Sequence, residues 1–112
     1  MQRVFNTLDT QHQALDRRPT LEELVRDTGW VTETTAVTQE PDGTLVHWRM
    51  PLHQVVAARM SFTGKSLRSE LGGNFSKYVV QVNHEKRELA EDWSNGVVSA
   101  LNYMDCKRRT SW

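Results

Sequence analysis

The sequence lacks the features that define several common classes of protein. It has one cysteine, Cys106, so neither an internal disulfide nor a zinc site built on cysteines is available. It has no apolar run near the ~20 residues that a membrane-spanning helix needs, and no basic-then-apolar start of the kind that directs secretion. We therefore expect a cytoplasmic protein that does not associate with a membrane.

An excess of charge of one sign is also missing, because the formal net charge is 0 at pH 7. This excludes a uniformly basic nucleic-acid coat and an acidic mimic of DNA. The charges are nevertheless unevenly distributed along the chain. Residues 1–45 carry four basic and eight acidic side chains, whereas residues 46–81 carry five basic side chains and one acidic. A polyanionic partner would therefore prefer the middle of the chain.

Catalytic and cofactor motifs are absent as well. The run Thr63-Gly64-Lys65-Ser66 resembles the end of a phosphate-binding loop, but Arg59 stands where that loop requires its first glycine. His47 and His53 lack a Cys, Asp or Glu at ligand spacing, His12 and His84 are isolated, and no nucleophile elbow occurs. We therefore expect no enzymatic activity, no cofactor and no metal.

What is present predicts one small α+β domain over residues 1–112, a length typical of a single domain. Apolar spacing predicts a first helix over about 3–16 and a second over 21–28, where Thr20 and Glu23 have the spacing of a capping box. Threonine and valine then dominate up to a turn at Pro41-Asp42-Gly43, and β-type residues resume after it. This pattern predicts a β-hairpin over about 31–50.

The second half of the chain predicts further helices and one strand. Pro51 suits the start of a helix over about 52–60, whose buried face would carry Leu52, Val56 and Met60. A short helix over 66–71 and a strand over 78–82 would follow. A long C-terminal helix would begin at Asn83, with an apolar stripe that includes Leu89, Trp93, Val97, Leu101 and Met104.

Residues 52–71 resemble a helix-turn-helix motif. Ala57 supplies the small residue that the motif needs midway along its first helix, Ser61 and Phe62 match the turn and the apolar plug, and Leu67 faces the core. The resemblance implies a small sequence-specific DNA-binding regulator of transcription, whose partner is double-stranded DNA. Its contacts with DNA would come from the polar side chains around the second helix, namely Thr63, Lys65, Ser66, Arg68 and Ser69.

A neutral chain with one short recognition helix makes few phosphate contacts, so DNA binding would favour a homodimer. The predicted dimer seam is the C-terminal apolar stripe at Leu89, Trp93, Val97 and Leu101. The same stripe would serve equally well for packing within one chain.

Two other interpretations of the sequence stay open. The 52–71 segment has the spacing of an ordinary helical corner in a small core. The chain would then be a non-enzymatic adaptor or inhibitor that caps a partner protein through exposed tryptophans, the hairpin edge or the C-terminal helix, and its four tryptophans favour that function. RNA binding is a third function, with Phe62, Phe75 and Tyr78 as stacking surfaces.

Overall fold

The computed structural model describes residues 18–110, with side chains described up to residue 108. Over these residues the chain forms a small α+β domain in which one antiparallel sheet has the strand order β3-β2-β1-β4. The predicted fold class is therefore confirmed. The helix predicted over 3–16 and the terminal Trp112 lie outside the described residues.

A hairpin forms the centre of the sheet. Strand β1 (Ala36–Gln39) pairs with β2 (Leu45–Trp48), and the register places Thr38 opposite Val46. The predicted hairpin is confirmed, but its first strand begins at Ala36 rather than at residue 31. A turn precedes it, in which Thr34 N–H donates to the Val31 carbonyl and Glu33 has a φ of 73°.

Gly43 makes the hairpin turn possible. Its φ of 94° lies in the left-handed region, and a Cβ at this position would stand 2.1 Å from the carbonyl oxygen of Arg87. The turn therefore fits closely against the segment that follows β3 (Val79–Asn83), which pairs with β2 at one edge of the sheet.

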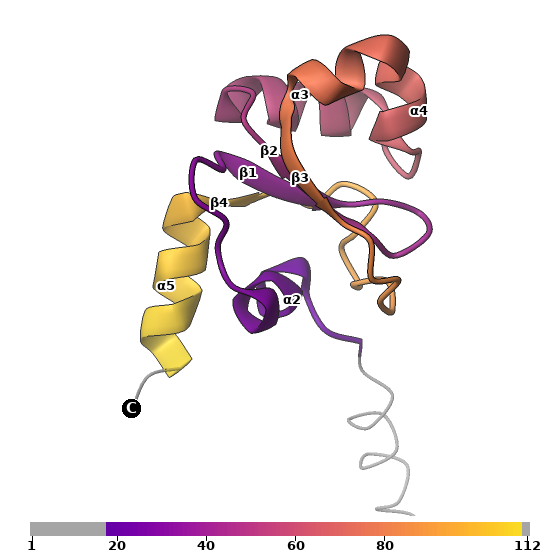
Figure 1. The fold of residues 1–112 in the computed structure, drawn as a ribbon. Helices are drawn as coiled ribbons and strands as arrows, with labels where there is room; N and C mark the ends of the chain where they lie inside the picture. The colour runs from indigo at the N-terminus through magenta and orange to yellow at the C-terminus, as the bar shows by residue number, and fades with distance from the viewer. Residues whose placement is uncertain (1–17, 111–112) are drawn as a thin grey trace, which may run out of the picture.

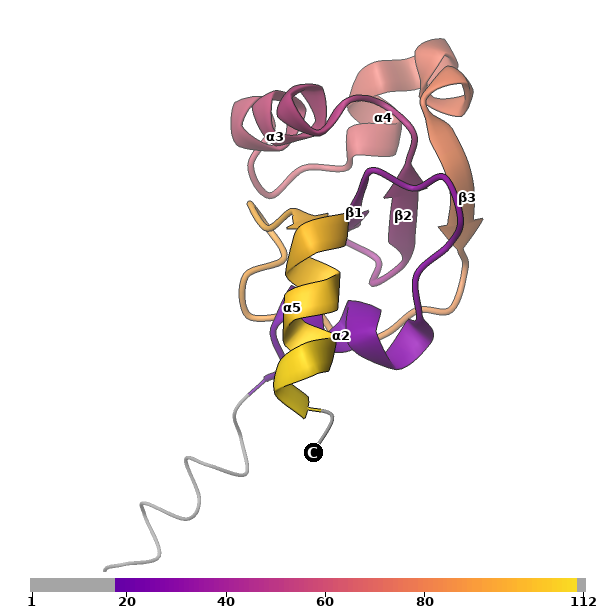
Figure 2. The ribbon, with the colours of Figure 1, turned by 90° about the vertical axis from the view of Figure 1, so that its left-hand side faces the viewer.

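Helices cover one face of the sheet, as Figures 1 and 2 show above the strands. They are α3 (Leu52–Ser61), α4 (Leu67–Leu71) and the 3-10 helix η1 (Gly72–Lys77). Alternate hairpin residues point toward them, and the core on this side consists of Ala36, Val46, Trp48, Met50, Val55, Leu67 and Phe75. The indole N–H of Trp48 donates to the Thr38 hydroxyl at 2.8 Å, so this buried aromatic ring has its polar group satisfied.

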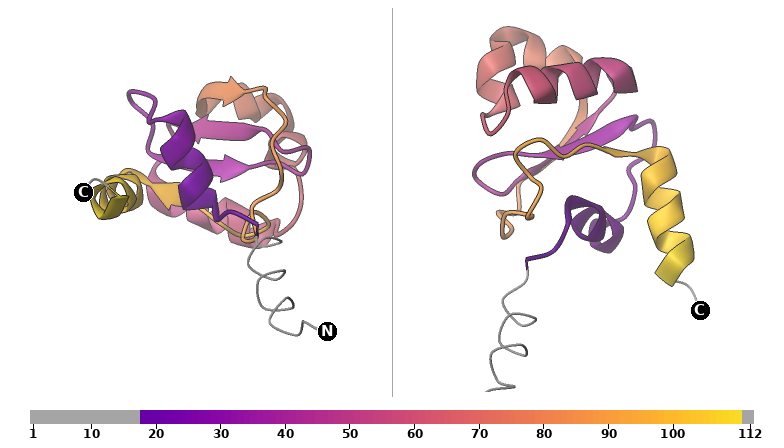
Figure 3. Two further views of the ribbon diagram at one scale, coloured as in Figure 1. Left: turned by 90° about the horizontal axis from the view of Figure 1, so that it is seen from below. Right: turned by 180° about the vertical axis from the view of Figure 1, so that it is seen from behind.

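The opposite face is covered by α2 (Leu21–Thr28) and by α5 (Ala100–Thr110), which continues from the edge strand β4 (Val98–Ser99) (Figure 3). Helix α2 begins with the predicted capping box, in which Thr20 accepts from Glu23 N–H and Glu23 accepts from Thr20 N–H. The second core consists of Leu21, Val25, Val37, Leu45, Ala90 and Val98. Trp30 packs against Tyr103 of α5, with ring centroids 5.3 Å apart.

The long C-terminal helix predicted from Asn83 is wrong over its first half. Residues 84–97 form a loop, and a helix begins only at Ala100. Tertiary hydrogen bonds hold this loop in place: Ala90 N–H donates to the Gln39 side chain at 2.9 Å, and Asp92 accepts from Leu21 N–H at 2.9 Å. Within the loop, the backbone at Gly96 lies so close to Asp92 that a Cβ at position 96 would stand 2.5 Å from the Asp92 carbonyl oxygen.

The predicted dimer seam is consequently wrong as a single helical stripe. Leu89, Trp93 and Val97 lie in the loop, and Trp93 and Val97 pack against the cores on opposite faces of the sheet. Leu101 is on α5 and 74% exposed.

No helix among residues 18–110 is long and apolar enough to cross a membrane.

His47 is a buried side chain whose titration should affect stability. It is 1% exposed, and within the described structure neither ring nitrogen has a hydrogen-bond partner. Burial lowers the pKa of His47 below its ordinary value, and the charge of Arg87 lowers it further. The unfolded chain therefore binds a proton near pH 6.5 while the folded chain does not, so stability falls as the pH drops below about 6.5.

We expect His47→Leu to raise the free energy of unfolding by about 1 kcal/mol at neutral pH, because it removes a buried polar ring without partners. It should also reduce the loss of stability between about pH 7 and pH 5. Urea denaturation across this range measures both effects, with the exposed His84→Leu as control. If wild type and His47→Leu lost stability in parallel on acidification, His47 would not be the titrating group.

Candidate functional site

The helix-turn-helix region is held in shape by two buried charged side chains. Arg59 on α3 is 0% exposed, and Glu40, at the end of the hairpin strand β1, is 5% exposed. Charged residues are almost never fully buried unless they are paired or hydrogen-bonded. Their contacts therefore define how this part of the molecule is built.

The buried side chain of Arg59 holds the turn between α3 and α4 in place through hydrogen bonds. Its Nη2 donates to the Phe62 carbonyl and, at 2.6 Å, to the Lys65 carbonyl. Burial lowers the pKa of Arg59 from its ordinary value, and the negative charge of Glu40 opposes that shift. Gly64, with a φ of 76°, completes the turn and donates its N–H to the Ser94 carbonyl at 2.8 Å.

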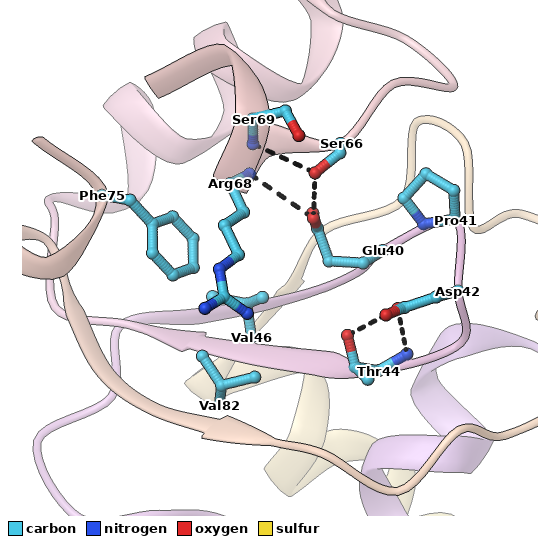
Figure 4. A pocket seen from close by; sticks show the side chains of 10 residues that line it. All are labelled: Glu40, Pro41, Asp42, Thr44, Val46, Ser66, Arg68, Ser69, Phe75 and Val82. Carbon is cyan, nitrogen blue, oxygen red and sulfur yellow. Dashed lines mark hydrogen bonds between the residues drawn. The ribbon is translucent and has the colours of Figure 1, made fainter. Parts of the chain in front are cut away.

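Glu40 holds the start of α4. Its carboxylate accepts from the Ser66 hydroxyl at 2.5 Å and from Arg68 N–H at 3.4 Å (Figure 4). It also accepts from Leu67 N–H at 3.0 Å. Ser66 is also the N-cap of α4, because its hydroxyl oxygen accepts from Ser69 N–H at 3.1 Å. The hairpin turn and the short helix are thus joined through one carboxylate.

The orientation predicted for α3, the first helix of the helix-turn-helix motif, is wrong. Val56 and Met60 were expected in the core, but they are 40% and 59% exposed, and Leu52 is 41% exposed. The buried residues of α3 are Val55 and Arg59. Ala57, the expected contact for a crossing second helix, is exposed too.

The predicted DNA-binding residues occupy two different settings. Thr63 and Lys65 lie in the turn before α4 rather than on it, and the Thr63 hydroxyl donates to the Met60 carbonyl at 3.0 Å. Leu67 faces the core, as predicted. Arg68 and Ser69 are exposed on α4, and the Arg68 guanidinium lies 5.7 Å from the Phe75 ring centroid.

A pocket of about 310 Å³ lies between the hairpin turn and α4. It brings together three of the predicted residues, Ser66, Arg68 and Ser69, with residues that sequence reasoning did not select. Those are Glu40, Pro41, Asp42, Thr44, Val46, Phe75 and Val82. A carboxylate in a hairpin turn looks like an ordinary solvated residue in the sequence, so only the pairing of 40 with 66–68 in space identifies Glu40.

Within the described part of the chain, no group of three or more His, Cys, Asp or Glu side chains could hold a metal ion. Comparisons of the chain with models of known protein families, with curated proteins and with solved structures found no match.

Glu40→Gln should lower the free energy of unfolding by about 2–4 kcal/mol. The amide accepts hydrogen bonds more weakly than the carboxylate, and it leaves the buried Arg59 without its nearby negative charge. Chemical denaturation measures the loss, and Glu88→Gln, an exposed position, is the control. A loss of less than about 0.5 kcal/mol, which is usual for a surface site, would show that the carboxylate contributes little.

Proposed function

We propose that this chain is a non-enzymatic protein-binding module and that it contacts its partner through the outer face of α3. The observation that carries this proposal is the exposure of three large apolar side chains, Leu52, Val56 and Met60. They are spaced four residues apart, so they form one continuous stripe along the helix. Contiguous exposed apolar surface is characteristic of interaction sites.

The α3 face carries no exposed charge. The one charged residue of α3 is Arg59, which is buried, and the polar residues beside the stripe are His53, Gln54 and Ser61. A stripe of apolar side chains along a helix normally faces other protein. The core covers only the side that carries Val55 and Arg59, so a partner would cover the other.

The charges at the two ends of α3 favour a particular kind of partner. Arg49 precedes the helix and Lys65 follows it, and both side chains are exposed. A protein surface with an apolar centre and acidic residues at its margins would match this arrangement, because complementary charges at the rim of an interface steer association.

The tryptophans of the described residues do not supply the exposed contact surface that the sequence predicts, since Trp48 is buried and Trp30 and Trp93 are partly buried. The hairpin offers no free edge either, because both of its strands are paired on either side.

DNA binding through α4 has less support. The helix has five residues, and its first N–H groups donate to the Glu40 carboxylate. That negative charge lies where a recognition helix would meet phosphate. The exposed Lys65, Arg68 and Ser69 nevertheless make DNA binding a function to be measured beside protein binding.

Site-specific photocrosslinking in cells tests the location of the surface. A photoreactive amino acid at position 56 should link to one protein that the same group at position 86, in the exposed loop, does not reach. That protein is then purified, and its affinity for this chain is measured by calorimetry. Crosslinks only between copies of this chain, or equal crosslinking from both positions, would overturn the assignment of a separate partner to this face.

We expect Val56→Lys to weaken binding of the purified partner by at least about tenfold, because it places a solvated charge in the apolar stripe. Gln54→Lys, at an exposed polar position of the same helix, should bind as wild type does. Both variants should keep the wild-type melting temperature, since neither side chain is buried.

Anisotropy titration with duplex DNA at low and high salt is the parallel measurement. Two results together would replace this proposal with DNA binding. The first is tight, strongly salt-dependent binding of DNA that Lys65→Gln and Arg68→Gln weaken, and the second is an unchanged affinity of Val56→Lys for the protein partner.

A further inference from the structure

The pocket between the hairpin turn and α4 has the dimensions of a small-molecule site, and both polar and apolar side chains line it. Its volume of about 310 Å³ is at the lower end of the range of about 300–1,000 Å³ that ligand pockets occupy. Its lining residues come from the β1–β2 turn, from β2 and β3, and from α4 and η1, and none comes from α3. It is therefore separate from the proposed protein-binding face.

One part of the lining is apolar. Val46 from β2, Val82 from β3 and Phe75 from η1 line the pocket together (Figure 4). Phe75 is itself held edge-on against Trp48, with ring centroids 5.5 Å apart. Val46 is 0% exposed and lies behind the surface, so a branched aliphatic or aromatic side chain would contact the partly exposed Val82 and the edge of Phe75, which is 8% exposed.

Arg68 supplies a positive charge beside this apolar surface. Its side chain extends from α4 into the pocket, and its guanidinium lies over the Phe75 ring (Figure 4). Within the described residues it forms no ion pair, so its N–H groups are available to a ligand. A guanidinium binds a carboxylate with two parallel hydrogen bonds, which is the geometry that arginine favours.

Asp42 supplies a negative charge from the hairpin turn. Thr44 donates both its N–H, at 3.0 Å, and its hydroxyl, at 2.8 Å, to the same carboxylate oxygen, Oδ1. These bonds lower the pKa of Asp42, so the group is ionised at neutral pH. The second oxygen, Oδ2, is left for a ligand, whereas both oxygens of Glu40 already accept from Ser66–Arg68.

The balance of these charges selects the ligand. A simple anion would pair with Arg68 but leave Asp42 without a counter-charge, and a simple cation would pair with Asp42 but leave Arg68 without one. A molecule that carries both charges and an apolar group satisfies every part of the lining. We propose that this pocket binds a free α-amino acid with an apolar side chain, its carboxylate on Arg68, its ammonium on Asp42 and its side chain on Phe75 and Val82.

Titration followed by NMR and calorimetry tests the proposal with phenylalanine and leucine as probes. Binding should shift the methyl resonances of Val46 and Val82. Three analogues each remove one feature: 3-phenylpropionate lacks the ammonium, phenethylamine lacks the carboxylate and glycine lacks the side chain. Each should bind at least about tenfold more weakly than phenylalanine, which corresponds to a loss of about 1.4 kcal/mol.

Equal binding of 3-phenylpropionate would make the pocket an anion site, and equal binding of phenethylamine would make it a cation site. Either result overturns the amino-acid assignment. So does the absence of any shift with phenylalanine and leucine up to about 10 mM, well above the ~1 mM dissociation constant of a weak ligand.

Variants of the full chain assign the two charged contacts. Arg68→Gln and Asp42→Asn should each weaken phenylalanine binding by about tenfold or more, and Asp42→Asn keeps an oxygen to accept from Thr44. Lys77→Gln, an exposed cation outside the lining, is the matched control and should leave binding unchanged. If Lys77→Gln reduced binding as much as Arg68→Gln, the effect would be one of overall charge and the pocket would not be the site.

Discussion

The buried carboxylate of Glu40 is the interaction on which the arrangement of the sheet and the upper helices depends. It comes from the hairpin and accepts from the hydroxyl and N–H groups at the start of α4, while its charge also acts on Arg59. Removing either charge alone would leave the other buried without its counter-charge, which costs more than the pair contributes. The α3–α4 turn, the position of α4 and the pocket beneath it therefore form one connected structure.

The central hairpin imposes a second constraint, because helices or loops cover both of its faces. Gln39 shows how the lower side is held: its side-chain amide donates to the Gly43 and Glu88 carbonyls and its oxygen accepts from Ala90 N–H. These three bonds bind the loop after β3 to the hairpin turn. A helix over residues 84–97 would use those backbone groups internally and leave the buried amide of Gln39 unsatisfied.

Sequence reasoning succeeds here where a local residue type determines the backbone. The Thr20–Glu23 capping box, the Pro41-Asp42-Gly43 turn and the start of α3 after Pro51 were all predicted, because each depends on neighbours in the chain. It fails where a contact between residues distant in the sequence determines which side of a helix is buried. A helical pattern predicts that an arginine is solvated unless a partner such as Glu40 is known. The sequence therefore predicts that α3 buries its apolar stripe, whereas the structure buries Arg59 instead.

The inward position of Arg59 also explains why α3 has an unusual outer surface. A buried guanidinium is a weak source of stability, and leaving Leu52, Val56 and Met60 in water forgoes about 25 cal/mol for each Å² of apolar surface not buried. Rotating the helix by about one residue, or 100°, would bury the stripe, but it would expose Val55 and break the hydrogen bonds of Arg59 to the Phe62 and Lys65 carbonyls. The apolar outer face that results from the observed orientation is the surface on which the proposed protein-binding function rests. That face and the pocket under α4 share no residue, so the two proposed binding functions can be lost separately by mutation.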